Sequence, residues 1–139
     1  MTTWGDESRR HRGHRQGGGA ARRLAAALQG LAFALQEGDA SDVAVLLDAR
    51  ATLVVDTGGL VPAPASPISG RDAVAAALAE VAAAHEDASF AAQQVNGLPG
   101  LAIRADGRIV GIVVGALRRR RIADIWIVLN PEKLRHWNR

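Results

Sequence analysis

The last third of the chain, Val95 to Trp137, constrains the fold most, because it contains three strand-like runs in close succession. Asp106-Gly107 separates the first two runs, and this pair favours a tight hairpin because both central positions tolerate positive φ. Pro131 follows the last run and cannot continue a sheet ladder. The segment therefore predicts an antiparallel meander that ends at Asn130-Pro131, with strands over residues 101–105, 108–117 and 120–129.

Helical patterns precede this meander. Residues 20–37 predict a helix with one apolar face, because leucines recur there at three- and four-residue spacing. Gly38 is a stop signal for that helix, and Asp39 or Ser41 can cap a short helix after it. A further helix is expected from Ser69, its capping residue, to about Ala84.

Two more strands are predicted, over residues 51–56 and 88–96. We expect the stretch Gly97 to Gly100 to interrupt the second of them, and Pro62 to Pro67 to be extended and irregular. Helices that are segregated from a run of consecutive strands are typical of the α+β class.

The composition describes one folded domain with a basic leader. The chain has 139 residues, enough for a single domain. Residues 1–19 are rich in arginine, histidine and glycine, and such a segment cannot bury enough apolar surface to offset the entropy lost on ordering. We therefore expect a disordered basic arm over residues 1–19 and a folded domain over residues 20–139.

The charge is uneven. The net charge is +3, and the basic residues gather near the two ends of the chain, including the run Arg118 to Arg121. This asymmetry indicates an acidic partner, such as nucleic acid or an acidic protein face, although solvated charge explains it equally simply.

Several classes of chemistry and location are disfavoured. The chain has no cysteine, which excludes disulfides and thiolate chemistry. Its apolar runs are shorter than the ~20 residues that a membrane-spanning helix needs. His11 and His14 lie in the predicted arm without carboxylate partners, so no metal site is expected, and no cofactor motif is present. A cytoplasmic protein that does not bind membranes is the expectation.

Several short motifs resemble one family. Asp106-Gly107-Arg108, the close Asn130-Pro131 with Lys133 and Leu134, and the glycine turn after Asp56 resemble the carboxyl-terminal SnoaL-like domain of sigma J-type extracytoplasmic-function sigma factors. The resemblance implies an α+β, nuclear transport factor 2-like cone, in which a curved, antiparallel-rich sheet wraps around about three helices. It covers residues 20–137.

Enzymes of this architecture, such as polyketide cyclases, ketosteroid isomerases and epoxide hydrolases, place a carboxylate or similar group on the pocket wall. Asp124 and Trp126 resemble part of the cyclase pattern in the last strand, where alternation puts Ile122, Asp124, Trp126 and Val128 on one face. Ile127 stands where a further aspartate is expected, and the chain has no tyrosine. Asp124 is therefore a weak catalytic candidate, and we expect an apolar pocket without adjacent carboxylates.

The resemblance also marks residues of a ligand pocket or a docking surface: Asp56, Gly58, Gly59, Asn96, Trp126, Asn130 and Lys133. In the family, the glycine loop contacts the sigma body and the turn at Asn96 lines the pocket region. Plain turns and strand ends explain the same residues structurally.

The sequence thus favours a non-catalytic accessory or regulatory domain that binds a protein partner of the transcription machinery, such as a sigma factor or RNA polymerase, or a small apolar ligand. A small-molecule enzyme of the cyclase, isomerase or epoxide hydrolase kind is the alternative. Weak, non-specific nucleic-acid binding by the arm and the arginine run is a third option, and a homodimer across the open sheet face is a further expectation.

Overall fold

The computed structural model describes residues 7–59 and 67–138, and the side chains from residue 18 onward. The helices are α1 (Glu7–Glu37), α2 (Ala40–Ala44), α3 (Arg71–Ala83) and α4 (Pro131–Leu134), and a short 3-10 turn, η1 (Arg135–Trp137), follows α4. The strands are β1 (Leu47–Asp56), β2 (Ile68–Ser69), β3 (Ser89–Val95), β4 (Leu98–Ala105), β5 (Arg108–Arg118) and β6 (Arg121–Val128). The predicted α+β class is confirmed.

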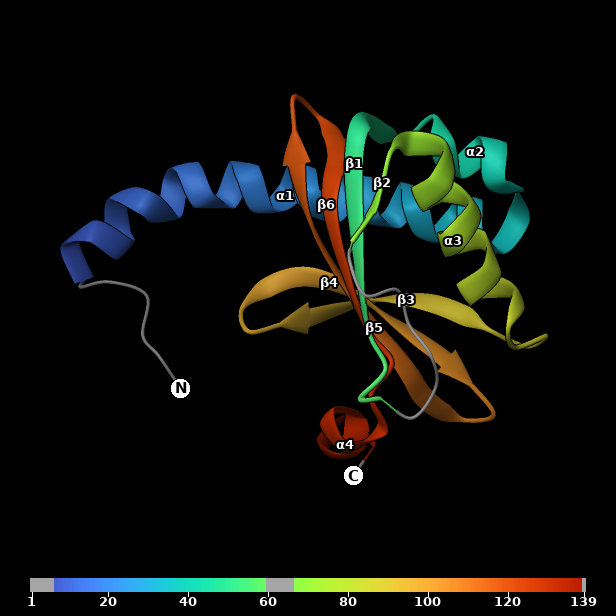
Figure 1. Ribbon diagram of the computed structural model, residues 1–139. Coiled ribbons are helices and arrows are strands. Elements are labelled where there is room, and N and C mark those ends of the chain that lie inside the picture. Colours follow the sequence, from blue (N-terminus) through green and yellow to red (C-terminus); the bar gives the residue numbers. More distant parts are fainter. Residues whose placement is uncertain (1–6, 60–66, 139) are drawn as a thin grey trace.

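The strands form one six-stranded sheet in the order β2-β1-β6-β5-β4-β3. Every neighbouring pair is antiparallel except β1 and β6, which run parallel and are paired without interruption from Thr52↔Asp124 to Asp56↔Val128. The expected meander is therefore present as β4, β5 and β6, and β1 joins its open edge. Figure 1 shows α1 crossing behind β1 and β6, with α2 and α3 to one side and α4 beyond the far end of β6.

The main core lies between the helices and one face of the sheet. Leu28 and Leu31 of α1, Leu53 of β1, Leu78 of α3 and Ile127 of β6 are almost fully buried there. Two hydrogen bonds join the layers: Arg71 Nε donates to the Leu47 carbonyl at 3.1 Å, and the Phe90 amide donates to Gln36 Oε1 at 2.7 Å. These contacts fix α3 against β1 and α1 against β3.

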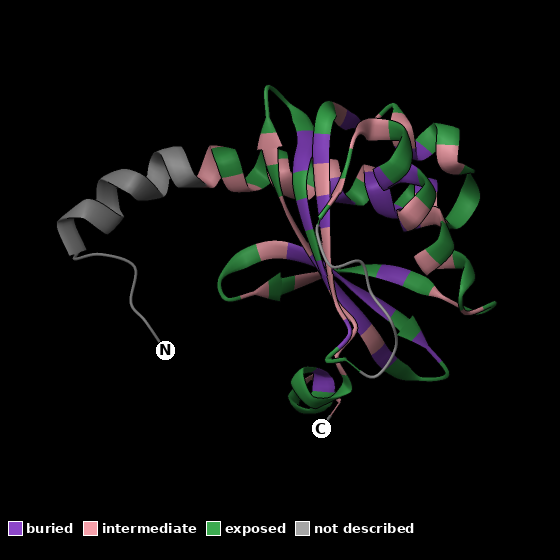
Figure 2. Ribbon diagram, viewed as in Figure 1, coloured by how far each residue is buried: buried purple, intermediate pink, exposed green. Residues whose placement is uncertain are grey.

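A smaller apolar cluster lies on the opposite face of the sheet. Ala102, Ile109, Ile112 and Leu134 are its buried members, and Trp137 packs against them. The Asn138 side chain accepts from the Ile109 amide at 2.7 Å and donates to the Ile109 carbonyl at 2.9 Å, which holds the end of the chain on β5. The α4–η1 segment thus packs on part of the outer sheet face. Figure 2 shows α4 with both buried and exposed residues.

The first helix differs from the prediction in its start. The sequence places that start at residue 20, but the backbone is helical from Glu7, and the early turns project beyond the sheet (Figure 1). An existing helix lengthens by one hydrogen bond per added residue without a new nucleus, so a polar, glycine-containing segment can continue it. Residues 1–6 of the predicted arm lie outside the described residues.

The N-cap of α3 also differs from the prediction. Gly70, not Ser69, is the N-cap of α3, and no side chain caps it. Asp39 caps α2 as expected, because its carboxylate accepts from the Asp42 amide in a reciprocal capping box. Most of the predicted Pro62–Pro67 stretch lies outside the described residues.

Two strand predictions are corrected. Gly97 to Gly100 do not interrupt the sheet: Asn96-Gly97 form the hairpin turn, and Pro99 already lies in β4 opposite Gln94. Pairing of β4 with β5 reaches only as far as Leu101, so β5 does not need the amide that proline lacks. In β6, a register shift at Ala123 places Ile122 in the main core, whereas Asp124 and Trp126 lie on the outer face.

Candidate ligand pocket

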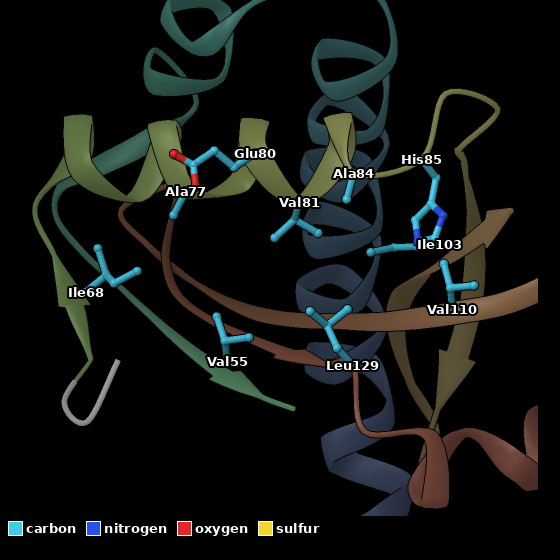
Figure 3. A pocket seen from close by; sticks show the side chains of 10 residues that line it. All are labelled: Val55, Ile68, Ala77, Glu80, Val81, Ala84, His85, Ile103, Val110 and Leu129. Carbon is cyan, nitrogen blue, oxygen red and sulfur yellow. The ribbon is translucent and has the colours of Figure 1, made fainter. Parts of the chain in front are cut away.

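A cavity of about 360 Å³ lies between α3 and the end of the sheet where β1 and β6 finish. Ten residues line it: Val55, Ile68, Ala77, Glu80, Val81, Ala84, His85, Ile103, Val110 and Leu129. In Figure 3, Val81 points from α3 towards the sheet, and Val55, Leu129 and Val110 point up towards the helix. Eight of the ten are apolar, which confirms the predicted apolar lining.

The local sequence explains how these side chains converge. Ala77, Val81 and Ala84 are four and three residues apart, so they share one face of α3 and of the turn that follows it. A β-bulge between β4 and β5 leaves Val110 without an opposite residue, because Ile103 pairs with Gly111 and Arg104 pairs with Ile109. A bulge re-aims side chains, and Val110 consequently takes part in the wall.

Gly111 leaves room beside this wall for the side chains of two lining residues. A β-carbon at Gly111 would lie 2.9 Å from both Ile103 Cδ1 and Leu129 Cδ2, and both of these side chains line the cavity. A larger residue at 111 would therefore displace two of the apolar contacts that shape the cavity.

Glu80 and His85 are the polar members of the lining. Glu80 lies in the last turns of α3 and is exposed, whereas His85 follows the helix and is partly buried. Figure 3 shows the His85 ring beside Ile103 and Val110, and Ile68 at the opposite end of the view. Sequence reasoning missed both residues as pocket residues, because a glutamate and a histidine at the end of an alanine-rich helix have no distinctive spacing.

The aspartates considered for chemistry do not line this cavity. Asp124 is exposed on the outer sheet face, where its carboxylate accepts a hydrogen bond from Thr52 Oγ1 at 3.1 Å. Trp126 is on the same face and is 50% exposed. Only one carboxylate, that of Glu80, is among the lining residues, so the described chain offers no adjacent carboxylate pair in the cavity.

Several predicted site residues meet at a different place, the junction of β1 and α4. Lys133 Nζ donates to Asp56 Oδ2 at 2.6 Å, and the Gly58 amide donates to Asp56 Oδ1 at 3.0 Å. The hydrogen bond from Lys133 and then that from the Gly58 amide lower the pKa of the Asp56 carboxyl. Asn130 Oδ1 accepts from the Glu132 amide at 3.1 Å and caps α4. We call Asp56, Gly58, Asn130 and Lys133 the latch.

The remaining predicted site residues lie apart from the latch core. Gly59 follows Gly58 in the same turn and is exposed. Asn96 lies at the β3–β4 hairpin with φ 53°, and Trp126 lies on the outer sheet face. The structure therefore brings four of the seven predicted residues together and leaves the cavity to residues that were not predicted.

Similar folds occur among solved structures. The extracytoplasmic function sigma factor SigJ of Mycobacterium tuberculosis matches with a TM-score of 0.58 and 20% identity over 80% of this chain and 43% of that one. A steroid delta-isomerase from Pseudomonas aeruginosa matches with a TM-score of 0.57 and 21% identity over 81% and 82%. An NTF2-like protein from Burkholderia xenovorans matches with a TM-score of 0.54 and 14% identity over 85% and 97%.

These likenesses establish a nuclear transport factor 2-like, SnoaL-like fold. The sequence predicted a particular similarity to sigma J-type domains. The comparison supports only a distant structural similarity to them, because the isomerase matches this chain as well as the sigma factor does. The chain spans less than half the length of that sigma factor. No family model matches the sequence, and no curated protein matches it either. Within the described residues, no helix is long and apolar enough to cross a membrane.

Proposed function

We propose that the chain is a non-catalytic binding module that holds a small apolar ligand between α3 and the sheet. The observation that supports this most is the cavity of about 360 Å³ with an almost wholly apolar wall. That volume is within the range of about 300–1,000 Å³ that is usual for small-molecule sites. The apolar wall favours a ligand that loses its hydration shell on entry.

The two polar lining residues define the ligand more closely. His85 is partly buried at the cavity and can either donate or accept a hydrogen bond. Glu80 is exposed and stays hydrated. The ligand that suits this arrangement is mainly hydrocarbon and carries one hydroxyl or carbonyl group that meets His85.

A regulatory role in transcription is part of the proposal, and the fold shared with sigma factor SigJ supports it. In this role the cavity senses a ligand, and a protein partner such as a sigma factor or RNA polymerase reads the surface. Gly59, Lys133, Asn96 and Trp126 are exposed and remain the proposed docking residues. The latch links the surface around Lys133 to the end of β1, whose Val55 lines the cavity.

The binding proposal can be tested with Nile red, a neutral apolar dye that fluoresces in apolar surroundings. Ala77→Leu fills the cavity from α3, whereas Ala76→Leu adds the same side chain to an exposed position of the same helix. We expect Ala77→Leu to weaken dye binding at least tenfold and Ala76→Leu to leave it near wild type. Equal binding by both variants, with circular dichroism confirming their folds, would contradict the proposed cavity.

A second candidate is a small-molecule enzyme, because Glu80 and His85 both line the apolar cavity. A carboxylate and an imidazole are common proton-transfer groups. The matched fold of a steroid delta-isomerase suggests a Δ5-3-ketosteroid as the test substrate. We expect no isomerisation by ultraviolet absorbance. Turnover that disappears in both Glu80→Gln and His85→Asn would replace the binding module by the enzyme.

A further inference from the structure

Three two-residue hairpins in the sheet have the same backbone geometry. Their central residues have φ of 53° and 81° at Asn96-Gly97, 54° and 72° at Asp106-Gly107, and 52° and 72° at Arg119-Arg120. In the first two hairpins the chain uses the residue pairs that favour this left-handed geometry. The third uses two arginines, whose β-carbons make the same geometry strained. The molecule therefore keeps arginines at a turn for which Asn-Gly is the better local choice.

These arginines form one wall of a groove. A hollow of about 400 Å³ lies between the β5–β6 hairpin, α1 and the end of α2, and Arg119, Arg120 and Arg121 line it together with Ala27, Val45 and Leu46. The groove is distinct from the cavity under α3, with which it shares no residue. Figure 1 shows the β5–β6 hairpin rising past α1 at the end of the sheet opposite α4.

The neighbouring arginines of the same run hold the groove in place. Arg121 Nη1 donates to the Val45 carbonyl at 2.6 Å, and Arg118 Nη1 pairs with Asp48 Oδ2 at 2.9 Å. The first contact joins the hairpin to the connection that follows α2, and the second joins it to the start of β1. Arg118 and Arg121 thus attach the hairpin to the rest of the domain, whereas Arg119 and Arg120 do not take part in these two contacts.

The charges of the two central arginines, Arg119 and Arg120, are unpaired among the residues that the structure describes. Within the described part of the chain, the side chains of Arg119 and Arg120 make no hydrogen bond and no ion pair, and both residues are exposed. Arg22 and Arg23 of α1 are also exposed, and Arg23 is four residues before Ala27, so it shares the helix face that borders the groove. The floor is apolar, and Val45 is 64% exposed.

We propose that this groove, which has arginine walls and an apolar floor, binds an acidic protein segment that carries an aliphatic side chain between carboxylates. The guanidinium groups suit carboxylates, which they can bind through paired hydrogen bonds. The aliphatic side chain covers Val45 and Leu46. A protein segment fits better than nucleic acid, because none of the described residues that line the groove is an aromatic residue on which a base could stack. This docking site goes beyond the ligand cavity proposed above and does not depend on it.

Three fluorescein-labelled probes of equal charge distinguish the ligand classes. The first is a peptide in which pairs of glutamates flank leucines, the second has serine in place of leucine, and the third is a single-stranded oligonucleotide. In fluorescence anisotropy at about 0.15 M salt, where exposed charges are largely screened beyond 8 Å, we expect the leucine peptide to bind tightest. Equal or tighter binding of the oligonucleotide, or equal binding of the serine peptide, would overturn the proposed partner.

The decisive variant is Arg119→Asn with Arg120→Gly, which restores the residue pair of the β3–β4 hairpin. We expect it to raise the unfolding midpoint, because it relieves two strained positions, and to weaken leucine-peptide binding at least tenfold. Loss of binding in this variant cannot come from unfolding if the midpoint rises. Binding as tight as that of the wild type would overturn the site.

The matched control removes two arginines elsewhere. Arg104 and Arg108 are exposed on either side of the β4–β5 turn and make no ion pair within the described residues. Arg104→Gln with Arg108→Gln gives the same change in net charge and should change peptide binding less than twofold. A loss as large as that at the groove would show that overall charge, and not this site, attracts the peptide. Val45→Ser should remove the preference for leucine over serine; a preserved preference would overturn the role of the floor.

Discussion

Lys133 and Asp56 join two ends of the fold that are far apart in the sequence. The Lys133 ammonium donates to the Asp56 carboxylate at 2.6 Å across a separation of 77 residues. Next to this pair, the Leu129 amide donates to the Asp56 carbonyl at 2.7 Å, so backbone and side chain of one residue hold both the end of β6 and α4. Asp56 thus links the end of β1 to both the residue after β6 and the helix α4.

The latch should make stability depend on pH. Folding lowers the pKa of Asp56 below its ordinary value of 3.8, chiefly through Lys133. A carboxyl of this kind stabilises the fold above its unfolded pKa and loses that contribution as pH falls through the folded pKa. Urea midpoints should therefore be higher for the wild type than for Asp56→Asn above about pH 5, and should converge at lower pH. A difference that is constant down to the acid transition would contradict the charged pair.

Substitutions at two adjacent glycines should distinguish the cost of a steric contact from the cost of backbone strain. Gly58 and Gly59 have φ of 70° and 80°, so alanine is strained at both. A β-carbon at Gly58 would also lie 2.5 Å from Asn130 Oδ1, whereas at Gly59 no atom of the described residues would be within 4 Å. We expect Gly58→Ala to lower the free energy of unfolding by about 0.5–2 kcal/mol more than Gly59→Ala, because the backbone strain is common to both and only Gly58→Ala displaces the cap of α4. Equal losses in chemical denaturation would show that Asn130 moves freely.

Leu134 should contribute more stability than its neighbour. It is 4% exposed and packs in the outer cluster, so Leu134→Ala should cost about 2 kcal/mol or more. Lys133 is exposed, and surface ion pairs contribute roughly 0–1 kcal/mol, so Lys133→Ala should change stability little. Denaturant titration compares the two. A Leu134→Ala variant of wild-type stability that no longer binds a partner would identify a docking motif in place of a structural close.

The first residues should be dispensable for folding. Among the side chains of α1 that the structure describes, from residue 18 onward, the first buried one is Leu28. Deleting residues 1–19 should leave the thermal unfolding midpoint nearly unchanged, because their sequence has no apolar periodicity and ends in three glycines. A decrease of several degrees would show that this segment packs on the domain.

The periodic parts of the fold could be predicted from the sequence, and the irregular parts could not. Leu28 and Leu31 marked the buried face of α1, and Asp106-Gly107 marked a hairpin, because both signals are local. The bulges at Val110 and Ala123 arise from pairing between strands and leave no local signal, yet they decide which residues face the cavity and which face the outside. For the same reason Glu80 and His85 were missed, and Asp124 was considered for a pocket that it does not reach.

The parallel pairing of β1 with β6 also sets the order in which the molecule can be completed. Thr52 and Asp124 are partners across 72 residues, so β1 has no long neighbour until the last strand has been synthesised. Contacts of such separation are slow to form. The two sides of the sheet, β2-β1 and β5-β4-β3, can therefore be joined only after β6 has been synthesised.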